Sequence, residues 1–400
     1  MLRSLLHTYR ESFEGLSAEI WWLALVTFIN RAGTMVIPFM SLYLTEELNF
    51  TLSQVGWIMA AFGLGSLTGS WIGGKLTDSI GYYSVMFRSL LTTGFLFITL
   101  QFITSFWGFF FGVLITMTVA DSFRPAMFVS LKAYSKPENL TRSLTLIRLA
   151  INLGFSFGPF LGGLIILSMG YKGLFWVDGI TCILAIVLFR FILKRKAFES
   201  SDSPDEHLAK PQTVYKDKPY WLFLVIVFLM GFVFMQLFST IPLFYKNIHG
   251  LSELQIGLLL SLNGMLIFLT EMPLIHKLEQ SSIDKTKIIM WSLLLLSLSY
   301  LVLNLTAWTG ILIISIVFIT IGEMMAFPFV NAFAMTRAIK GKEGLYMALY
   351  SMAFSSSHIF SPKTGMEVID RFGYSYNWFL LGGLALVAVA LTIWLRKIVT

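Results

Sequence analysis

Ionisable side chains stand deep inside three long apolar stretches of the sequence, as Arg31, Glu271 and Glu323. An ionisable group inside a membrane span costs about 2.5–3.5 kcal/mol on insertion scales, so each residue needs a functional or a structural reason. Burial raises the pKa of a carboxyl group, and a nearby arginine lowers it. We therefore expect a carboxylate that faces a cavity near Arg31 to exchange protons at physiological pH as the conformation changes.

Polar residues accompany Arg31 at steps of 4, 3, 4 and 3, which place them on one face of a helix: Thr27, Arg31, Thr34, Pro38 and Ser41. A polar face next to lipid would be expensive, so this face is expected to line a central cavity, with Asn30 beside it. The other candidates for a substrate and proton cavity are Asn152, Glu271, Glu323, Asn331 and His358.

Several of these candidates have a structural alternative. Glu323 is preferred over Glu271 as the coupling carboxylate because Thr320 and Asn331 share its helical face. Both glutamates are also adjacent to prolines, where they would cap or latch helices instead. His358 either titrates near neutral pH or packs as a hydrogen-bonded histidine.

The composition places these residues in an integral membrane protein. Of 400 residues, 56% are hydrophobic and 13% are charged, whereas a soluble domain carries about 25% charged residues. Soluble enzymes, nucleic-acid-binding proteins and secreted disulfide scaffolds are therefore excluded. Apolar runs long enough to cross roughly 30 Å of hydrocarbon as helices occur at 21–44, 54–73, 84–104, 107–131, 145–168, 174–193, 220–245, 256–275, 288–307, 309–334, 345–366 and 376–396.

The distribution of charge predicts the orientation and the domains. Most of the 29 Lys and Arg residues lie in or beside cytoplasmic segments if both termini are cytoplasmic, as the positive-inside rule requires. We expect an N-terminal cytoplasmic or interfacial segment (1–19), a six-helix bundle (20–193), a cytoplasmic linker (194–219) and a second six-helix bundle (220–400). Asp178, near the outer end of its stretch, is expected at a helix start.

The two halves repeat at an offset near 203 residues. Residues of the first half that match the second are Leu146, Ala150, Pro159, Gly162, Gly170 and Tyr171, opposite Leu349, Ala353, Pro362, Gly365, Gly373 and Tyr374. An even number of spans in each half makes the repeats parallel, and such a design places a binding site between the halves near the membrane midplane. The repeat therefore indicates a transporter with two pseudo-symmetric bundles.

Two glycine motifs carry a family resemblance. The predicted loop after the second apolar run reads Gly74-Lys75-Leu76-Thr77-Asp78-Ser79-Ile80-Gly81, and the fifth run contains Gly154, Gly158 and Pro159. With the twelve spans and the repeat, these residues make nearly the whole chain resemble the major facilitator superfamily, particularly its drug:proton antiporter branch. The first motif is similar to the family's helix 2–3 loop signature, and the second to the antiporter signature of helix 5.

The resemblance implies roles for these residues. Asp78, with Gly74 and Gly81, would latch the two halves on the cytoplasmic side, although the basic residues that the family usually has around the second glycine are missing here. Glycines four apart let helices approach closely, and a proline bends a helix where halves must rock; tight packing without antiport chemistry is the alternative. Asp121 and Arg124, three residues apart, are expected to form a local ion pair and to act as a latch.

The sequence as a whole predicts a secondary active transporter that works by alternating access in a plasma membrane, the bacterial inner membrane in particular. We expect a monomeric, proton-coupled antiporter that exports a small amphiphilic or drug-like solute, without a cofactor, without nucleic acid and without enzymatic activity. Asn30-Arg31 stands where the family's exporters of cationic drugs often have an acidic residue, which favours a neutral, zwitterionic or anionic solute. The alternatives are a proton symporter or uniporter for a sugar, peptide or organic acid, and a non-transporting scaffold or receptor.

Overall fold

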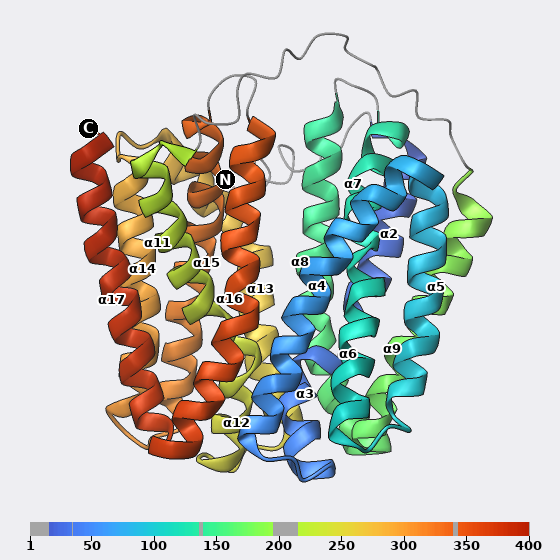
Figure 1. Ribbon diagram of the computed structural model, residues 1–400, viewed down its shortest axis with the longest axis horizontal. Helices are drawn as coiled ribbons and strands as arrows, with labels where there is room; N and C mark the ends of the chain where they lie inside the picture. Colours follow the sequence, from blue (N-terminus) through green and yellow to red (C-terminus); the bar gives the residue numbers. More distant parts are fainter. Residues whose placement is uncertain (1–15, 34, 136–138, 195–214, 339–342, 400) are drawn as a thin grey trace, which may run out of the picture. The chain divides into compact units, whose positions relative to one another are not determined.

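The computed structural model describes residues 16–33, 35–135, 139–194, 215–338 and 343–399 (Figure 1). Every regular element within these ranges is a helix. Residues 1–15 of the predicted N-terminal segment, residues 195–214 of the predicted linker and Thr34 of the polar face lie outside the described residues.

The helices follow the predicted apolar runs closely. In the first half they are α2 (Ala18–Ala32), α3 (Val36–Leu42), the π-turn η1 (Tyr43–Glu47), α4 (Leu52–Ile80), α5 (Tyr82–Leu100), α6 (Phe106–Asp121), α7 (Phe123–Tyr134), α8 (Leu140–Met169) and α9 (Tyr171–Ile192). In the second half they are α11 (Lys218–Met235), η3 (Gln236–Phe238), α12 (Thr240–Asn247), α13 (Glu253–Gln280), α14 (Lys285–Leu301), η4 (Val302–Asn304), α15 (Gly310–Arg337), α16 (Glu343–Phe372) and α17 (Tyr374–Val399).

Eleven helical segments within the described residues are long and apolar enough to cross a membrane. The remaining predicted run, 345–366, the eleventh in the chain, forms α16, which is long enough but less apolar. Its polarity comes from one lysine and a series of serines, Ser351, Ser355, Ser356, Ser357 and Ser361. Ser357 and Ser361 are fully buried, so α16 directs polar groups toward protein and not toward lipid.

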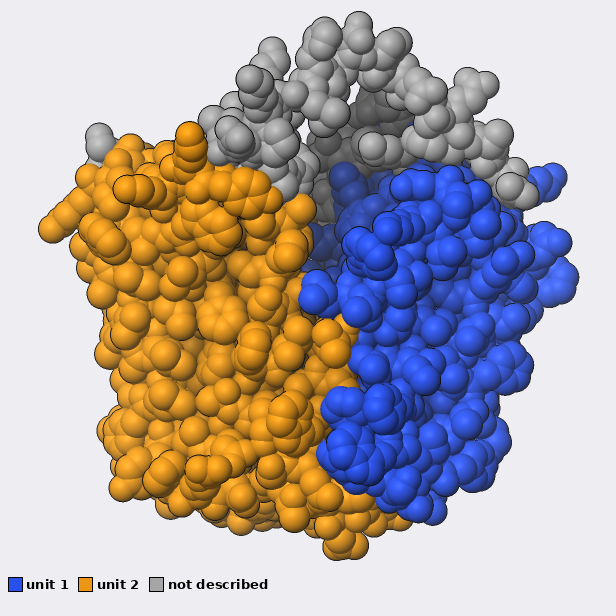
Figure 2. Space-filling view, in the orientation of Figure 1, with its two compact units in different colours: residues 1–36, 65–200 blue, residues 37–64, 201–400 orange. Residues whose placement is uncertain are grey.

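The helices belong to two compact units, coloured separately in Figure 2. Unit 1 comprises residues 1–36 and 65–200, and unit 2 comprises residues 37–64 and 201–400. In unit 1, α2 packs against α8 and α9, and α5 packs against α6, α7 and α9. In unit 2, α14 packs against α15 and α17, α11 packs against α16 and α17, and α13 packs against α15.

The first helix of each predicted half is interrupted at a matching place. α2 ends before Gly33 and α3 starts at Val36, while α11 gives way to η3 at Gln236, which is 203 residues after Gly33. Buried polar side chains lie at both interruptions, where a backbone that leaves regular hydrogen bonding inside a membrane needs other partners.

The side chain of Gln236, at the second interruption, is hydrogen-bonded to neighbouring helices. Its Nε2 donates to the Ser361 carbonyl oxygen at 2.7 Å and to Ser361 Oγ at 2.9 Å, and its Oε1 accepts from Thr240 Oγ1 at 2.6 Å. Asn377 Nδ2 contacts the same Oε1 at 3.5 Å. These buried residues therefore connect the interruption after α11 to α12, α16 and α17.

The prediction of a loop at 74–81 is wrong, because α4 continues through Ile80. No proline interrupts this segment, and a helix keeps its own backbone groups hydrogen-bonded as it leaves the apolar region. Only Gly81 leaves the helix: its φ of 81° is a left-handed conformation that glycine adopts readily, and it precedes α5. Gly74 is half-buried and Asp78 is exposed on the last turns of α4.

Candidate functional site

Arg31 lies in the last turn of α2, within unit 1, and is half-buried. Its Nε is buried and has no hydrogen-bond partner within the part of the chain that the structure describes. Its Cζ lies 5.6 Å from the centre of the Phe155 ring, on α8. A guanidinium holds five N–H donors in a fixed fork, so an arginine with an unused donor at this depth is suited to bind a carboxylate or a phosphate.

Asp121 and Arg124 lie within electrostatic range of Arg31 but do not form the predicted ion pair with each other in the described structure. α6 ends at Asp121 and α7 begins at Phe123, and Ser122 between them keeps helical backbone angles (φ −63°, ψ −22°). The helical spacing of three residues is therefore present, and it permits an ion pair without enforcing one. Asp121 is half-buried and Arg124 is exposed.

The interruption between α2 and α3 is held by Asp178, whose role the sequence analysis missed. Its carboxylate accepts hydrogen bonds from the Met35 N–H at 2.9 and 3.0 Å and from the Val36 N–H at 2.9 Å. The expectation of a helix-start residue is wrong, since α9 begins at Tyr171 and Asp178 is fully buried within it. One turn further, Cys182 Sγ accepts from Asn30 Nδ2 at 3.6 Å.

Replacing Asp178 with asparagine should lower the thermal stability of the protein. The amide would turn an N–H donor toward the Met35 N–H in the place of the accepting Oδ1, and the oxygen in the place of Oδ2 would lose its negative charge. Both changes weaken the hydrogen bonds to the two backbone N–H groups, by about 1–3 kcal/mol. The measurement is the thermal unfolding midpoint in detergent. Asp370→Asn, at an exposed position of α16, is the control. Equal midpoints for Asp178→Asn and the wild type would contradict this role.

The glycines of the helix 5 motif bring α8 close to α2. A Cβ on Gly154 would lie 2.5 Å from Arg31 Cβ and 2.9 Å from the backbone nitrogen of Ala32. Gly158 and Pro159 are buried in the same helix, and Pro159 removes one backbone N–H from its interior. Asn152, two residues before Gly154, is half-buried. The motif therefore positions the helix that carries Arg31.

Alanine substitutions at two motif glycines should act in opposite directions. Gly154→Ala should destabilise the protein by about 1–3 kcal/mol, because overpacking a tight contact forces backbone shifts. A Cβ on Gly74 would meet nothing within 4 Å, so Gly74→Ala should be neutral or stabilising by up to about 1 kcal/mol, the usual difference within a helix. Thermal unfolding of both variants provides the comparison. Destabilisation by Gly74→Ala as large as that by Gly154→Ala would disprove the packing argument.

Glu323 forms a polar cluster in unit 2. Asn263 Nδ2, on α13, donates to Glu323 Oε2 and to Thr320 Oγ1, each at 3.0 Å, and both acceptors are on α15. Thr320 is fully buried, Asn263 is buried and Glu323 is half-buried. The structure thus brings Thr320 and Glu323 together as predicted from their shared face, and adds Asn263.

The remaining predicted residues of unit 2 lie outside this cluster. Glu271 is buried on α13, two helical turns beyond Asn263. Asn331 is exposed on α15, although it shares the predicted face of Glu323. His358 is half-buried on α16, and its ring makes an edge-on contact with the Phe354 ring at 5.3 Å between centres.

A second polar cluster in unit 2 joins α16 to the first turns of α4. Lys363 Nζ donates to Glu367 Oε2 at 2.6 Å and to Ser53 Oγ at 2.8 Å, and it lies 5.1 Å from the centre of the Trp57 ring. Arg371 donates to the other oxygen of Glu367 at 2.6 Å. We name Ser53, Trp57, Lys363 and Glu367 the α4–α16 cluster.

Sequence reasoning missed Asn263, Gln236 and the α4–α16 cluster. The signal that could have found the first two is an amide side chain within an apolar run, since a buried amide must have a hydrogen-bond partner. The i, i+4 spacing of Lys363 and Glu367 also indicates an ion pair on one helix. Neither signal identifies the partner on another helix.

Residues 23–362 match the family profile of the Major Facilitator Superfamily, and the chain belongs to this family. It is therefore a multi-pass membrane protein of a transporter family whose substrates are small molecules.

Two curated relatives match over most of their length. One is a Na(+), Li(+), K(+)/H(+) antiporter of Planococcus maritimus, 20% identical over 92% of this chain and 93% of the relative. Another is Multidrug resistance protein 2 of Bacillus subtilis (strain 168), 23% identical over 91% of this chain and 91% of the relative.

The fold is also similar to that of solved transporters. The crystal structure of a POT family transporter in complex with a thioalcohol-conjugated peptide matches with a TM-score of 0.77 over 97% of this chain and 98% of that chain. The two sequences are 15% identical, so this likeness concerns the fold alone.

Proposed function

We propose that this protein exports a small amphiphilic solute in exchange for protons, by alternating access in a bacterial plasma membrane with both termini in the cytoplasm. The observation that carries the proposal is the cluster of Glu323 with Asn263 and Thr320. Placing a carboxyl group in the middle of a long apolar helix costs free energy, so its presence there indicates a function.

The partners of Glu323 suit a group that changes its charge. Asn263 is neutral and donates to the carboxylate, and it can also accept from a protonated acid through its own carbonyl oxygen. The carboxylate of Asp217, just before α11, has a charged partner: Arg337 donates to its two oxygens at 2.8 and 3.0 Å. Such a paired arginine stabilises the carboxylate and opposes protonation. Glu323 lies in the middle of α15, deep in an apolar run, and is the proposed proton site, whereas Asp217 is a structural ion pair.

Arg31 supports the proposal that the solute is anionic or zwitterionic. A cation with a buried, unused donor attracts anionic or zwitterionic groups and repels cations. The similarity to the cation/H(+) antiporter of Planococcus maritimus supports exchange against protons, and the similarity to the Multidrug resistance protein 2 of Bacillus subtilis supports export of drug-like solutes. The α4–α16 cluster is proposed as a gate contact that must open during the cycle.

The test uses inside-out membrane vesicles with an acidic interior. Neutral, zwitterionic, anionic and cationic amphiphiles are added one at a time while the pH gradient and the uptake of the solute are recorded. We expect an anionic or zwitterionic solute to accumulate inside while protons leave. Vesicles without the protein provide the baseline. Solute movement without proton release would contradict coupling, and solute leaving together with protons would show symport instead of antiport.

A further inference from the structure

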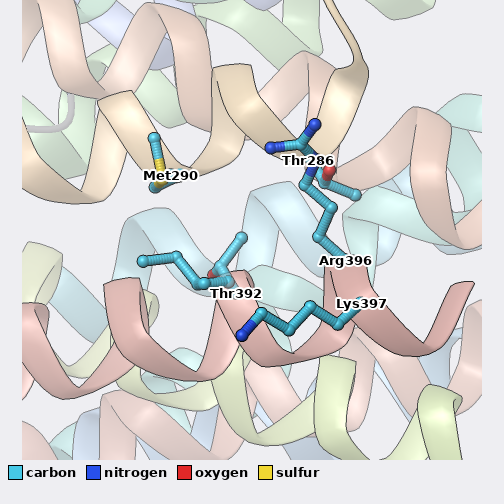
Figure 3. A pocket seen from close by; sticks show the side chains of 6 residues that line it. Thr286, Met290, Thr392, Arg396 and Lys397 are labelled. Atoms are coloured by element: carbon cyan, nitrogen blue, oxygen red, sulfur yellow. The ribbon is translucent and has the colours of Figure 1, made fainter. Parts of the chain in front are cut away.

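A basic cleft in unit 2 lies apart from both charged clusters described above. It is formed where α14 begins and α17 ends, and Figure 3 shows its side chains. The part between these helices has a volume of about 250 Å³ and is lined by Thr286, Met290, Thr392, Ile393, Arg396 and Lys397. An adjoining part of about 380 Å³ shares Thr286 and Arg396 and adds Lys285, Asp284 and apolar side chains.

The charge of the cleft is positive on balance. Arg396, Lys397 and Lys285 contribute three positive charges, and Asp284 contributes one negative charge. Burial alone would raise the pKa of Asp284, but hydrogen bonds from Thr286 and the charges of Arg396 and Lys287 hold it below its usual value. Asp284 is therefore ionised at neutral pH, and its 3.4 Å contact with Arg396 Nε offsets one of the three cations. The lining of the cleft therefore carries a net positive charge.

The other side chains of the cleft and its surroundings fit a lipid. Met290 and Ile393 provide an apolar wall beside the basic groups. Trp291 and Trp394, on the same two helices, are 52% and 55% exposed. Tryptophan is enriched where helices meet the membrane surface, at the depth of the lipid headgroups. The positive-inside rule predicts that this end of the unit faces the cytoplasm, where the leaflet carries anionic lipids.

We propose that this cleft binds the headgroup phosphate of an anionic phospholipid, with Arg396 and Lys397 holding the phosphate and Met290 and Ile393 contacting the start of an acyl chain. Lys and Arg side chains extend toward headgroups while their apolar stems stay in contact with the lipid chain. Lys397 makes no ion pair with any of the residues that the structure describes, so its charge is available to the phosphate.

The test measures binding of phosphatidylglycerol to the purified full-length protein by native mass spectrometry. Lys397→Gln leaves the Asp284–Arg396 pair in place and should weaken binding about fivefold, since one basic residue near a membrane surface contributes that much. The double variant Arg396→Gln, Lys397→Gln should weaken it roughly 25-fold. Lys277→Gln, an exposed basic residue in the last turn of α13, is the matched control and should change nothing.

Three outcomes would overturn the proposal. An equal loss with Lys277→Gln would mean that only diffuse surface charge attracts the lipid. Binding of phosphatidylcholine as tight as that of phosphatidylglycerol would mean that the basic groups do not select an anionic headgroup. Displacement of phosphatidylglycerol by inorganic phosphate at the same concentration would identify a soluble phosphate as the ligand.

Discussion

Vesicles that carry Glu323→Gln should release protons at a rate reduced roughly tenfold or more when the exported solute is added. Glutamine has nearly the same size as glutamate and still accepts a hydrogen bond from Asn263, so the contact between α13 and α15 is kept. It does not bind and release a proton in the working pH range. The variant should therefore still exchange labelled for unlabelled solute in the absence of a pH gradient.

The controls for this experiment separate coupling from folding. Glu279→Gln changes an exposed glutamate in the last turn of α13 and should leave proton release unchanged. Glu271→Gln tests the other carboxylate that the sequence singles out, which lies on α13. Normal proton release by Glu323→Gln would contradict the proposed proton site, and its loss only in Glu271→Gln would assign coupling to Glu271.

Replacing Arg31 with glutamine should raise the half-saturating concentration of an anionic or zwitterionic solute roughly tenfold or more, because a hydrogen bond to a charged group contributes about 1.5–3 kcal/mol. Arg31→Lys should recover only part of the affinity, since an ammonium keeps the charge but loses the planar fork. A neutral solute should be affected much less. The measurement is the concentration dependence of solute uptake into vesicles.

The control for Arg31 is Arg190→Gln, which removes an exposed arginine in the last turn of α9, within the same unit. It should leave the half-saturating concentration of every solute unchanged. Equal effects of Arg31→Gln on anionic and neutral solutes would indicate a structural arginine. Faster export of anionic solutes by Arg31→Gln would contradict the proposed recognition.

The membrane helices and the family could be predicted from the sequence. Lipid provides no hydrogen bonds, so each crossing requires a long apolar helix, and the apolar runs correspond to helices from α2 to α17. The glycine spacing at Gly154 also predicted a close approach between helices, and α8 makes one with α2, because a missing side chain permits it. These features depend on local composition, which a single sequence displays directly.

Local spacing failed at two places. Asp121 and Arg124 have a suitable spacing, but the half-buried Asp121 and the exposed Arg124 do not pair with each other in the described structure. Gly74 to Ile80 is polar enough to suggest a loop, yet it extends α4. Whether a helix ends at the membrane surface depends on what its last turns contact, and this information is not present in the segment itself.

The sequence by itself determined the membrane helices, the repeat and the presence of unusual charges at Arg31, Glu271 and Glu323. Only the tertiary structure decided which groups those charges meet. Asp178 binds backbone N–H groups 143 and 142 positions away, and Asn263 reaches Glu323 across 60 positions. The reason is physical: apolar runs specify that helices form, whereas the rotation and depth of each helix depend on side-chain packing between distant segments.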